Sequence, residues 1–135
     1  METKARVMDD ETSPLRNHRS PLLKTFAQAL DLVDDPAAIS AYEEYHRAVW
    51  PEVLAALREI GIERMEIFRV GTRMFMYFSA PDDFDPERDF QTYTESARCQ
   101  EWDELMRQYQ QRIPNATEGE WWTPMPCVFD TEWFE

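Results

Sequence analysis

The chain has 135 residues, which suits one domain of ordinary size and is too short for two domains with separate cores. Hydrophobic residues make up 43% of it and aromatic residues 13%, enough to build a packed core. Its 14 Lys and Arg stand against 27 Asp and Glu, a net charge of −13. That charge repels phosphate backbones and anionic lipids, so it excludes nucleic acid and membrane surfaces as partners but not a neutral ligand.

Several classes of site are excluded by what the sequence lacks. Three glycines are too few to build a phosphate-binding loop or a dinucleotide fingerprint. There is no apolar run of about 18 residues to cross a membrane, and residues 1–19 lack the apolar core of a secretory signal. Cys99 and Cys127 are predicted to be free thiols in a reducing cytoplasm, and neither a metal nor a cofactor is predicted.

Apolar periodicity predicts the elements, and turn and capping residues mark their ends. In chain order they are a flexible tail over residues 1–20, a strand over 22–32, a helix over 37–49 with a continuation over 51–60, strands over 62–70 and 73–80, helices over 86–93 and 97–113, and an edge strand within 121–134. Asp35 before Pro36, and Asp85 before Pro86, each predict the start of a helix. Pro51 either kinks the first helix or begins a second one.

This order of elements, β-α-β-β-α-β, is that of a ferredoxin-like plait, an α+β fold with helices on one face of an antiparallel sheet. We expect residues 21–135 to form this single domain. The helices leave the other face of the sheet open, and a second copy of the sheet could cover it. The sequence therefore predicts a homodimer that packs sheet against sheet.

His46 is the strongest candidate for chemistry, because the other histidine, His18, lies in the polar tail. Tyr42, His46 and Trp50 recur every fourth residue, which places them on one stripe of the predicted helix. A phenol, an imidazole and an indole in a row could line a pocket for a small polar ligand with an apolar face. The polar atoms of all three need partners when buried, which favours a site. The alternative is a core stripe in which His46 is hydrogen-bonded and inert.

Other chemistry has less support. One histidine in the predicted domain and two distant cysteines match no zinc pattern, and no nucleophile elbow supports a Ser-His-Asp triad. Most of the carboxylates are interpreted as a solvated acidic surface. The remaining tryptophans are interpreted chiefly as candidates for the core or for a dimer interface, namely Trp102, Trp121, Trp122 and Trp133.

The segment from Tyr42 through His46 to Trp50-Pro51-Glu52 resembles the signature of the L-rhamnose mutarotase family. The resemblance runs on into the predicted hairpin, and further matching residues are Cys99-Gln100-Glu101-Trp102 and Val128-Phe129, so that it covers about residues 24–129. It implies a ferredoxin-like fold assembled as a homodimeric α+β barrel. It also implies interconversion of the α and β anomers of a 6-deoxy sugar.

The same resemblance implies roles for individual residues. His46 matches the catalytic histidine of the family, Tyr42 a substrate-contacting tyrosine, and Trp102 the first residue of a Trp-Trp pair. Two positions depart from the family: Asp103 replaces the second tryptophan of that pair, and Met65 replaces a sugar-contacting tyrosine. Both are expected near the sugar, and we favour L-fucose over L-rhamnose as the substrate.

Mutarotation requires one proton delivered to the ring oxygen and another removed from the anomeric hydroxyl. A histidine, with an ordinary pKa of about 6.5, exchanges protons in both directions near neutral pH. Tyr42 would orient the sugar or relay a proton, and Trp50 and Trp102 would present flat surfaces to its C–H face. The second acid or base is expected to be a carboxylate or a water. The alternative is a cofactor-independent oxygenase, or a haem-binding or small-ligand-binding protein of the same fold.

Overall fold

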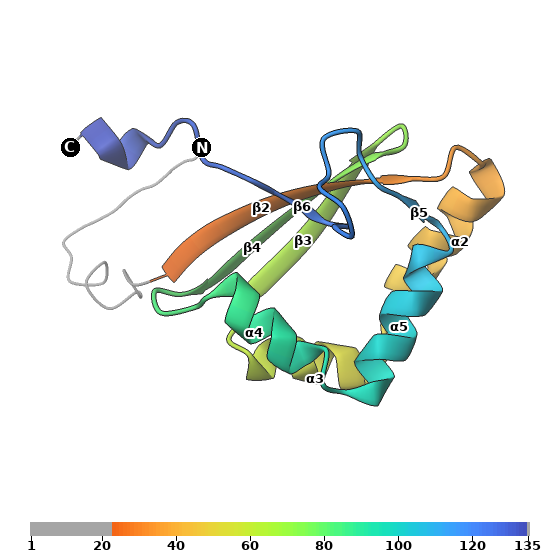
Figure 1. Cartoon of the computed structure of the whole chain (residues 1–135), viewed down its shortest axis with the longest axis horizontal. Coiled ribbons are helices and arrows are strands. Elements are labelled where there is room, and N and C mark those ends of the chain that lie inside the picture. Colours follow the sequence, from red (N-terminus) through yellow and green to blue (C-terminus); the bar gives the residue numbers. More distant parts are fainter. Residues whose placement is uncertain (1–22, 135) are drawn as a thin grey trace.

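A computed structural model describes residues 23–134 of the chain, so the predicted tail and its His18 lie outside the described residues. Five strands form one antiparallel sheet in the order β3-β4-β2-β5, with β6 also paired to β2 (Figure 1). The strands are β2 (Leu23–Leu32), β3 (Arg64–Val70), β4 (Arg73–Pro81), β5 (Gln110–Gln111) and β6 (Thr123–Met125). The long strand β2 therefore has partners on both of its edges.

The helices lie on one side of this sheet, which confirms the predicted α+β layering (Figure 1). They are α2 (Pro36–His46), α3 (Pro51–Glu59), α4 (Pro86–Tyr93) and α5 (Ala97–Arg107). The side chains of Asp35 and Asp85 each accept a hydrogen bond at 3.1 Å from the backbone two residues on, and a proline follows each cap. Both predicted helix starts are confirmed. No helix between residues 23 and 134 is long and apolar enough to cross a membrane.

Two predicted helices are shorter than expected. The first ends at His46 rather than at residue 49, and Pro51 begins a second helix. Pro51 disfavours the helical conformation for Trp50, whose backbone is extended at φ −59° and ψ 136°. The last helix ends at Arg107 rather than at residue 113, because the chain then turns back and residues 110–111 pair with the end of β2.

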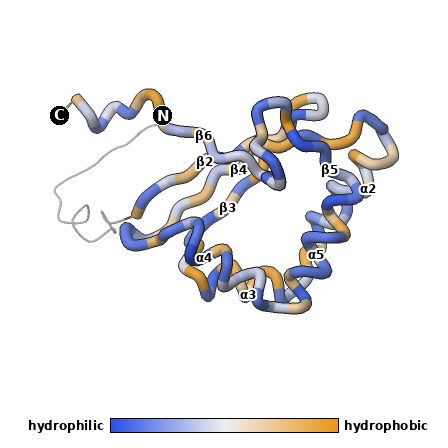
Figure 2. The backbone as a smooth tube through the Cα atoms, viewed as in Figure 1, coloured by the Kyte–Doolittle hydropathy of each residue, from blue (hydrophilic) through white to orange (hydrophobic). Residues whose placement is uncertain are grey.

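The strand predicted within residues 121–134 is short. Only the three residues of β6 pair with β2, and Pro124 and Pro126 lack the backbone N–H that a longer ladder would need. The chain then runs away from the sheet to a short 3₁₀ helix, η1 (Thr131–Phe134) (Figure 1). Figure 2 shows hydrophobic colour in the segment that follows β6. The large apolar side chains exposed in this segment are Val128, Phe129, Trp133 and Phe134.

Side-chain alternation gives the sheet two different faces. Met74, Met76 and Phe78 of β4 point toward the helices and are buried. On the opposite face, Phe68 and Phe75 are exposed, and their rings lie 6.2 Å apart across the β3–β4 pair. In the described chain this second face carries no helix, as the sequence predicted.

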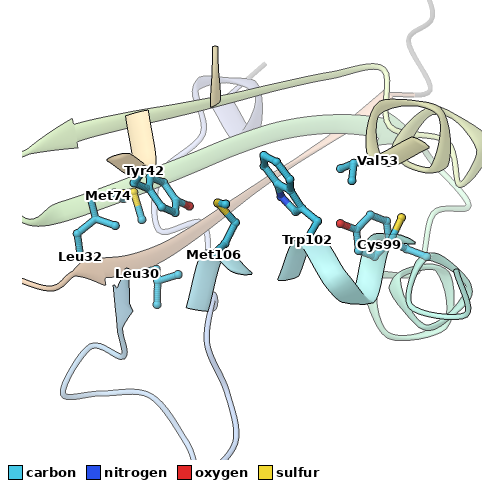
Figure 3. Close-up of a cluster of buried hydrophobic side chains, with 9 residues drawn as sticks. Leu30, Leu32, Tyr42, Val53, Met74, Cys99, Trp102 and Met106 are labelled. Carbon is cyan, nitrogen blue, oxygen red and sulfur yellow. The ribbon is translucent and has the colours of Figure 1, made fainter. Parts of the chain in front are cut away.

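The core between the sheet and the helices has two parts. The cluster packed against Val53 and Cys99 also contains Tyr42, Trp102 and Met106, and Figure 3 shows Met106 between Tyr42 and Trp102 in that view. The other cluster is built of hydrocarbon side chains and one thioether, with the buried residues Ile62, Met76, Phe78, Ala80 and Phe84. Only the first cluster therefore combines apolar packing with buried hydroxyl and indole groups.

Candidate active site

A cavity of about 530 Å³ lies between the sheet and the helices. Its volume suits a small-molecule ligand, and apolar side chains from β3, β4, α3 and α5 make up much of its wall. Five of the six predicted site residues line it, namely Tyr42, His46, Met65, Trp102 and Asp103. The sixth, Trp50, is not among the residues that line it.

His46 lies on the last turn of α2, one turn after Tyr42. Its Nδ1 is 2.9 Å from the backbone carbonyl oxygen of Tyr42. A carbonyl oxygen can only accept, so Nδ1 carries the proton of the neutral ring and Nε2 is left with a lone pair. Burial lowers the pKa of His46, against a smaller opposing effect of the carbonyl bond. At neutral pH the residue is therefore an uncharged base.

Tyr42 lies beside this imidazole, with the two ring centroids 4.3 Å apart. Gln110, from the short strand β5, donates a hydrogen bond of 3.2 Å to the Tyr42 hydroxyl. Burial raises the pKa of Tyr42 to about 12; the Gln110 hydrogen bond opposes the rise, and the charge of Asp103 adds to it. The hydroxyl therefore stays protonated at neutral pH and can donate a hydrogen bond.

Trp102, from α5, forms an aromatic wall beside His46. Its ring meets the imidazole edge to face at 5.4 Å. Trp50 packs against the same indole at 5.2 Å, and the guanidinium of Arg98 lies 3.7 Å from the centre of a Trp50 ring. Trp50 thus lies against Arg98 and the cavity-lining Trp102 rather than on the helical stripe that was predicted.

Asp103 is the only predicted site residue with a carboxyl group, and it is half-buried. The Tyr93 hydroxyl, from α4, donates a hydrogen bond of 3.1 Å to its Oδ1. Burial raises the pKa of Asp103, while the Tyr93 hydrogen bond and, to a smaller extent, the charge of Arg107 oppose the rise. Burial and the neighbouring carboxyl also raise the pKa of Tyr93 far above its ordinary value.

Sequence reasoning missed Tyr93 and Gln110, which both line the cavity. Tyr93 was expected only as the end of a short helix, and Gln110 was placed inside a helix that ends before it. Neither belongs to a local motif, since each reaches the site through long-range packing. Among residues 23–134, no group of three or more His, Cys, Asp or Glu side chains could hold a metal ion.

The arrangement suits proton transfer to and from an uncharged ligand. A neutral imidazole, a half-buried carboxyl and a tyrosine hydroxyl share one cavity whose remaining wall is mostly apolar. Hydroxyl groups of a ligand would find donors and acceptors there, and its hydrocarbon parts would contact Trp102 and Met65.

Comparisons with known proteins point to one family. A family model described as L-rhamnose mutarotase matches residues 25–131. A UPF0734 protein of Dictyostelium discoideum is 53% identical over 83% of this chain and 93% of its own length. An L-fucose mutarotase of Xanthomonas campestris pv. campestris is 38% identical over 79% of this chain and 87% of its own length.

Solved structures give the same fold at lower identity. L-rhamnose mutarotase from Formosa agariphila superposes with a TM-score of 0.59 at 20% identity, over 79% of this chain and 97% of that one. Tetracenomycin F2 cyclase from Streptomyces glaucescens superposes with a TM-score of 0.55 at 22% identity, over 79% of this chain and 95% of that one. These likenesses confirm the predicted ferredoxin-like α+β fold.

Proposed function

We propose that this chain, which belongs to the L-rhamnose mutarotase family of carbohydrate isomerases, interconverts the α and β anomers of a 6-deoxy hexose, with L-fucose preferred to L-rhamnose. The observation that supports this most is the hydrogen bond between His46 Nδ1 and the Tyr42 carbonyl. It orients a neutral imidazole with Nε2 free, in a cavity that also holds hydrogen-bonding groups for a sugar.

His46 acts as the base that opens the ring in this proposal. Its Nε2 removes the proton of the anomeric hydroxyl as the bond between the anomeric carbon and the ring oxygen breaks, and a second acid protonates the ring oxygen, which keeps the electron pair of that bond. The aldehyde then turns about the adjacent carbon–carbon bond, and the ring closes on its other face while the imidazolium protonates the carbonyl oxygen and the ring oxygen returns its proton to the second group. A lowered pKa suits this task, because the residue is unprotonated at neutral pH.

The walls of the cavity match the two sides of a 6-deoxy sugar. The Tyr42 hydroxyl and the amide of Gln110 are near enough to form one hydrogen-bonding group for sugar hydroxyls. The Trp102 indole offers a flat apolar surface to a C–H face, and Met65 offers an apolar contact for the methyl group. The preference for L-fucose rests on the departures at Met65 and Asp103, and the 38% identical relative named an L-fucose mutarotase supports it.

Magnetization transfer between anomers tests both the reaction and the substrate. We expect the protein to accelerate exchange between the α and β signals of L-fucose, and more weakly those of L-rhamnose, over buffer alone. An equal or greater rate on L-rhamnose would overturn the substrate preference and leave the reaction standing. Exchange at the buffer rate for both sugars would overturn the proposed function.

We also propose that two copies associate through the open face of the sheet. Phe68 is 54% exposed, Val70 77% and Phe75 37%, and they lie together on adjoining positions of β3 and β4. An exposed apolar surface of this kind on a sheet is typical of an interface between subunits. Sedimentation equilibrium at micromolar concentration should give twice the chain mass of 16.1 kDa. A single chain mass would contradict the dimer.

A further inference from the structure

We propose that Asp103 is the second proton-transfer group of this site, the general acid that works together with His46. The inference rests on the proposed mutarotase function and extends it to a residue at which the sequence departs from its family. Asp103 follows Trp102 directly on α5, and Trp102 contacts the His46 ring at 5.4 Å. Asp103 and His46 line the same cavity.

The hydrogen bonding of Asp103 leaves one oxygen available for a ligand. Oδ1 accepts the hydrogen bond from the Tyr93 hydroxyl at 3.1 Å. Oδ2 has no hydrogen-bond partner among the residues that the structure describes, and Asp103 forms no ion pair within residues 23–134. Tyr93 thus fixes the orientation of the carboxyl group, while Oδ2 can carry a proton toward a ligand.

The surroundings of Asp103 favour its protonated form more than water would. Burial disfavours the carboxylate, and this effect raises the pKa of Asp103 despite the opposing Tyr93 hydrogen bond. The titratable groups that face it are Tyr93 from α4, Tyr42 and His46 from α2, and Arg107 on its own helix. Of these, Arg107 is the one fixed charge, and it is exposed.

Ring opening is balanced when both residues act together. Asp103 gives its carboxyl proton to the ring oxygen, which keeps the electron pair of the breaking carbon–oxygen bond. His46 Nε2 takes the proton of the anomeric hydroxyl, whose oxygen forms the carbonyl double bond. Closure on the other face returns both protons: the ring oxygen gives its proton to the Asp103 carboxylate, and the His46 imidazolium protonates the carbonyl oxygen. No other reactant is consumed.

The test compares Asp103→Asn with Glu104→Gln in the full chain. Asparagine keeps the shape and can still accept the Tyr93 hydrogen bond, but it cannot transfer a proton. Glu104→Gln makes the same change from a carboxyl group to an amide on the exposed side of the same helix. With the buffer rate subtracted, we expect L-fucose exchange to fall by about 10²–10⁴-fold in Asp103→Asn and to stay at the parent rate in Glu104→Gln.

The pH profile separates proton transfer from a structural role. The parent profile should be bell-shaped, because exchange needs the neutral imidazole of His46 and the protonated carboxyl group of Asp103 at the same time. A folded Asp103→Asn protein should lose one of the two limbs and keep the limb set by His46. If this folded variant exchanges anomers at the parent rate, or keeps both limbs, the inference is overturned. A parent protein without activity would instead overturn the proposed function.

Tyr93→Phe provides a second test that does not depend on the folding of Asp103→Asn. It keeps the carboxyl group but removes the hydroxyl whose hydrogen bond lowers the pKa of Asp103. The pH optimum of exchange should therefore move upward while L-fucose is still turned over. An active variant with an unchanged optimum would contradict the role of Asp103.

Discussion

The two aromatic clusters of the core differ in what their rings carry. Phe78 stacks on Phe26 at 4.8 Å, and it meets Phe84 and Phe90 edge to face at 5.8 and 5.7 Å. We call these four residues the phenylalanine cluster; none of them has a polar side-chain atom. The second cluster, which we call the polar aromatic cluster, consists of Tyr42, His46, Tyr93 and Trp102, and every member has a polar atom and lines the cavity.

This difference indicates that the domain separates stability from chemistry. The phenylalanine cluster holds the sheet against the helices through buried hydrocarbon area, which needs no hydrogen-bond partners. The buried polar groups of the polar aromatic cluster need hydrogen-bond partners. The Tyr42 carbonyl, Gln110 and Asp103 provide some of these hydrogen bonds. Mutations in the first should therefore reduce stability, and mutations in the second should reduce the rate of the reaction.

Phe78→Ala should have the largest effect on stability. Phe78 is fully buried, and truncation of a buried phenylalanine typically costs about 3–5 kcal/mol through lost burial and the cavity left behind. Urea denaturation of parent and variant measures this difference. The activity per folded molecule should stay near that of the parent. A loss below about 1 kcal/mol would mean that the phenylalanine cluster does not dominate the packing.

His46→Asn should show the opposite pattern. Loss of the titratable nitrogen should lower the rate of anomer exchange by about 10²–10⁴-fold, the usual contribution of a general acid–base group. Stability and sugar affinity should change much less, because Tyr42 and Trp102 remain in place. Exchange rates and melting curves recorded on the same samples measure both effects. A large fall in stability, with activity lost only as folded protein is lost, would identify His46 as a core residue.

His46 should also contribute to the pH dependence of stability, and this effect should be smaller than the two above. Its pKa is lowered in the folded protein, so the unfolded chain, with the ordinary value of 6.5, takes up a proton first as the pH falls. His46 therefore stabilises the fold above that value, and this contribution is lost as the pH falls toward the folded pKa. Between pH 7.5 and 5.5 the parent should lose more stability than His46→Asn. Denaturation at both pH values measures this loss. An equal loss of stability in the parent and in His46→Asn would contradict the lowered pKa of His46.

The smallest effect on stability is expected from mutation of Arg98, which packs on Trp50 outside the cavity lining. Arg98→Ala should cost about 0.5–1 kcal/mol, the usual value of a cation–π contact at an exposed site. Arg64→Ala is the matched control, because Arg64 is paired with Glu66 on the surface. Its effect should be smaller still. If Arg98→Ala lowered the exchange rate as much as His46→Asn, Trp50 would belong to the reaction itself.

Local signals in the sequence predicted much of this architecture. The caps at Asp35 and Asp85, each followed by proline, marked two helix starts correctly, and Gly71 marked the hairpin turn, where its φ is +59°. These signals act over a few residues, because a cap or a turn satisfies the backbone next to it. That is why their positions could be predicted from the sequence alone.

Long-range pairing accounts for the parts that were not predicted. Nothing around Gln110 indicates that it leaves a helix to pair with Leu32, since that pairing depends on a strand at the other end of the domain. Tyr93 likewise reaches Asp103 only because α4 and α5 bring both residues to one cavity. The residues of the cavity could be named in part from spacing, whereas their hydrogen-bond partners depend on tertiary packing.

The central place of β2 in the sheet affects the order in which the domain can fold. β2 is the first described strand of the chain. One of its edges pairs with β4, and the other pairs with β6, which comes from the far end of the chain. Contacts between such distant segments close large loops and form slowly. Since synthesis proceeds from the N-terminus, β2 leaves the ribosome long before β6 exists. A chain cut short before Thr123 would leave the edge over Ala27–Ala29 unpaired and open to pairing with other chains.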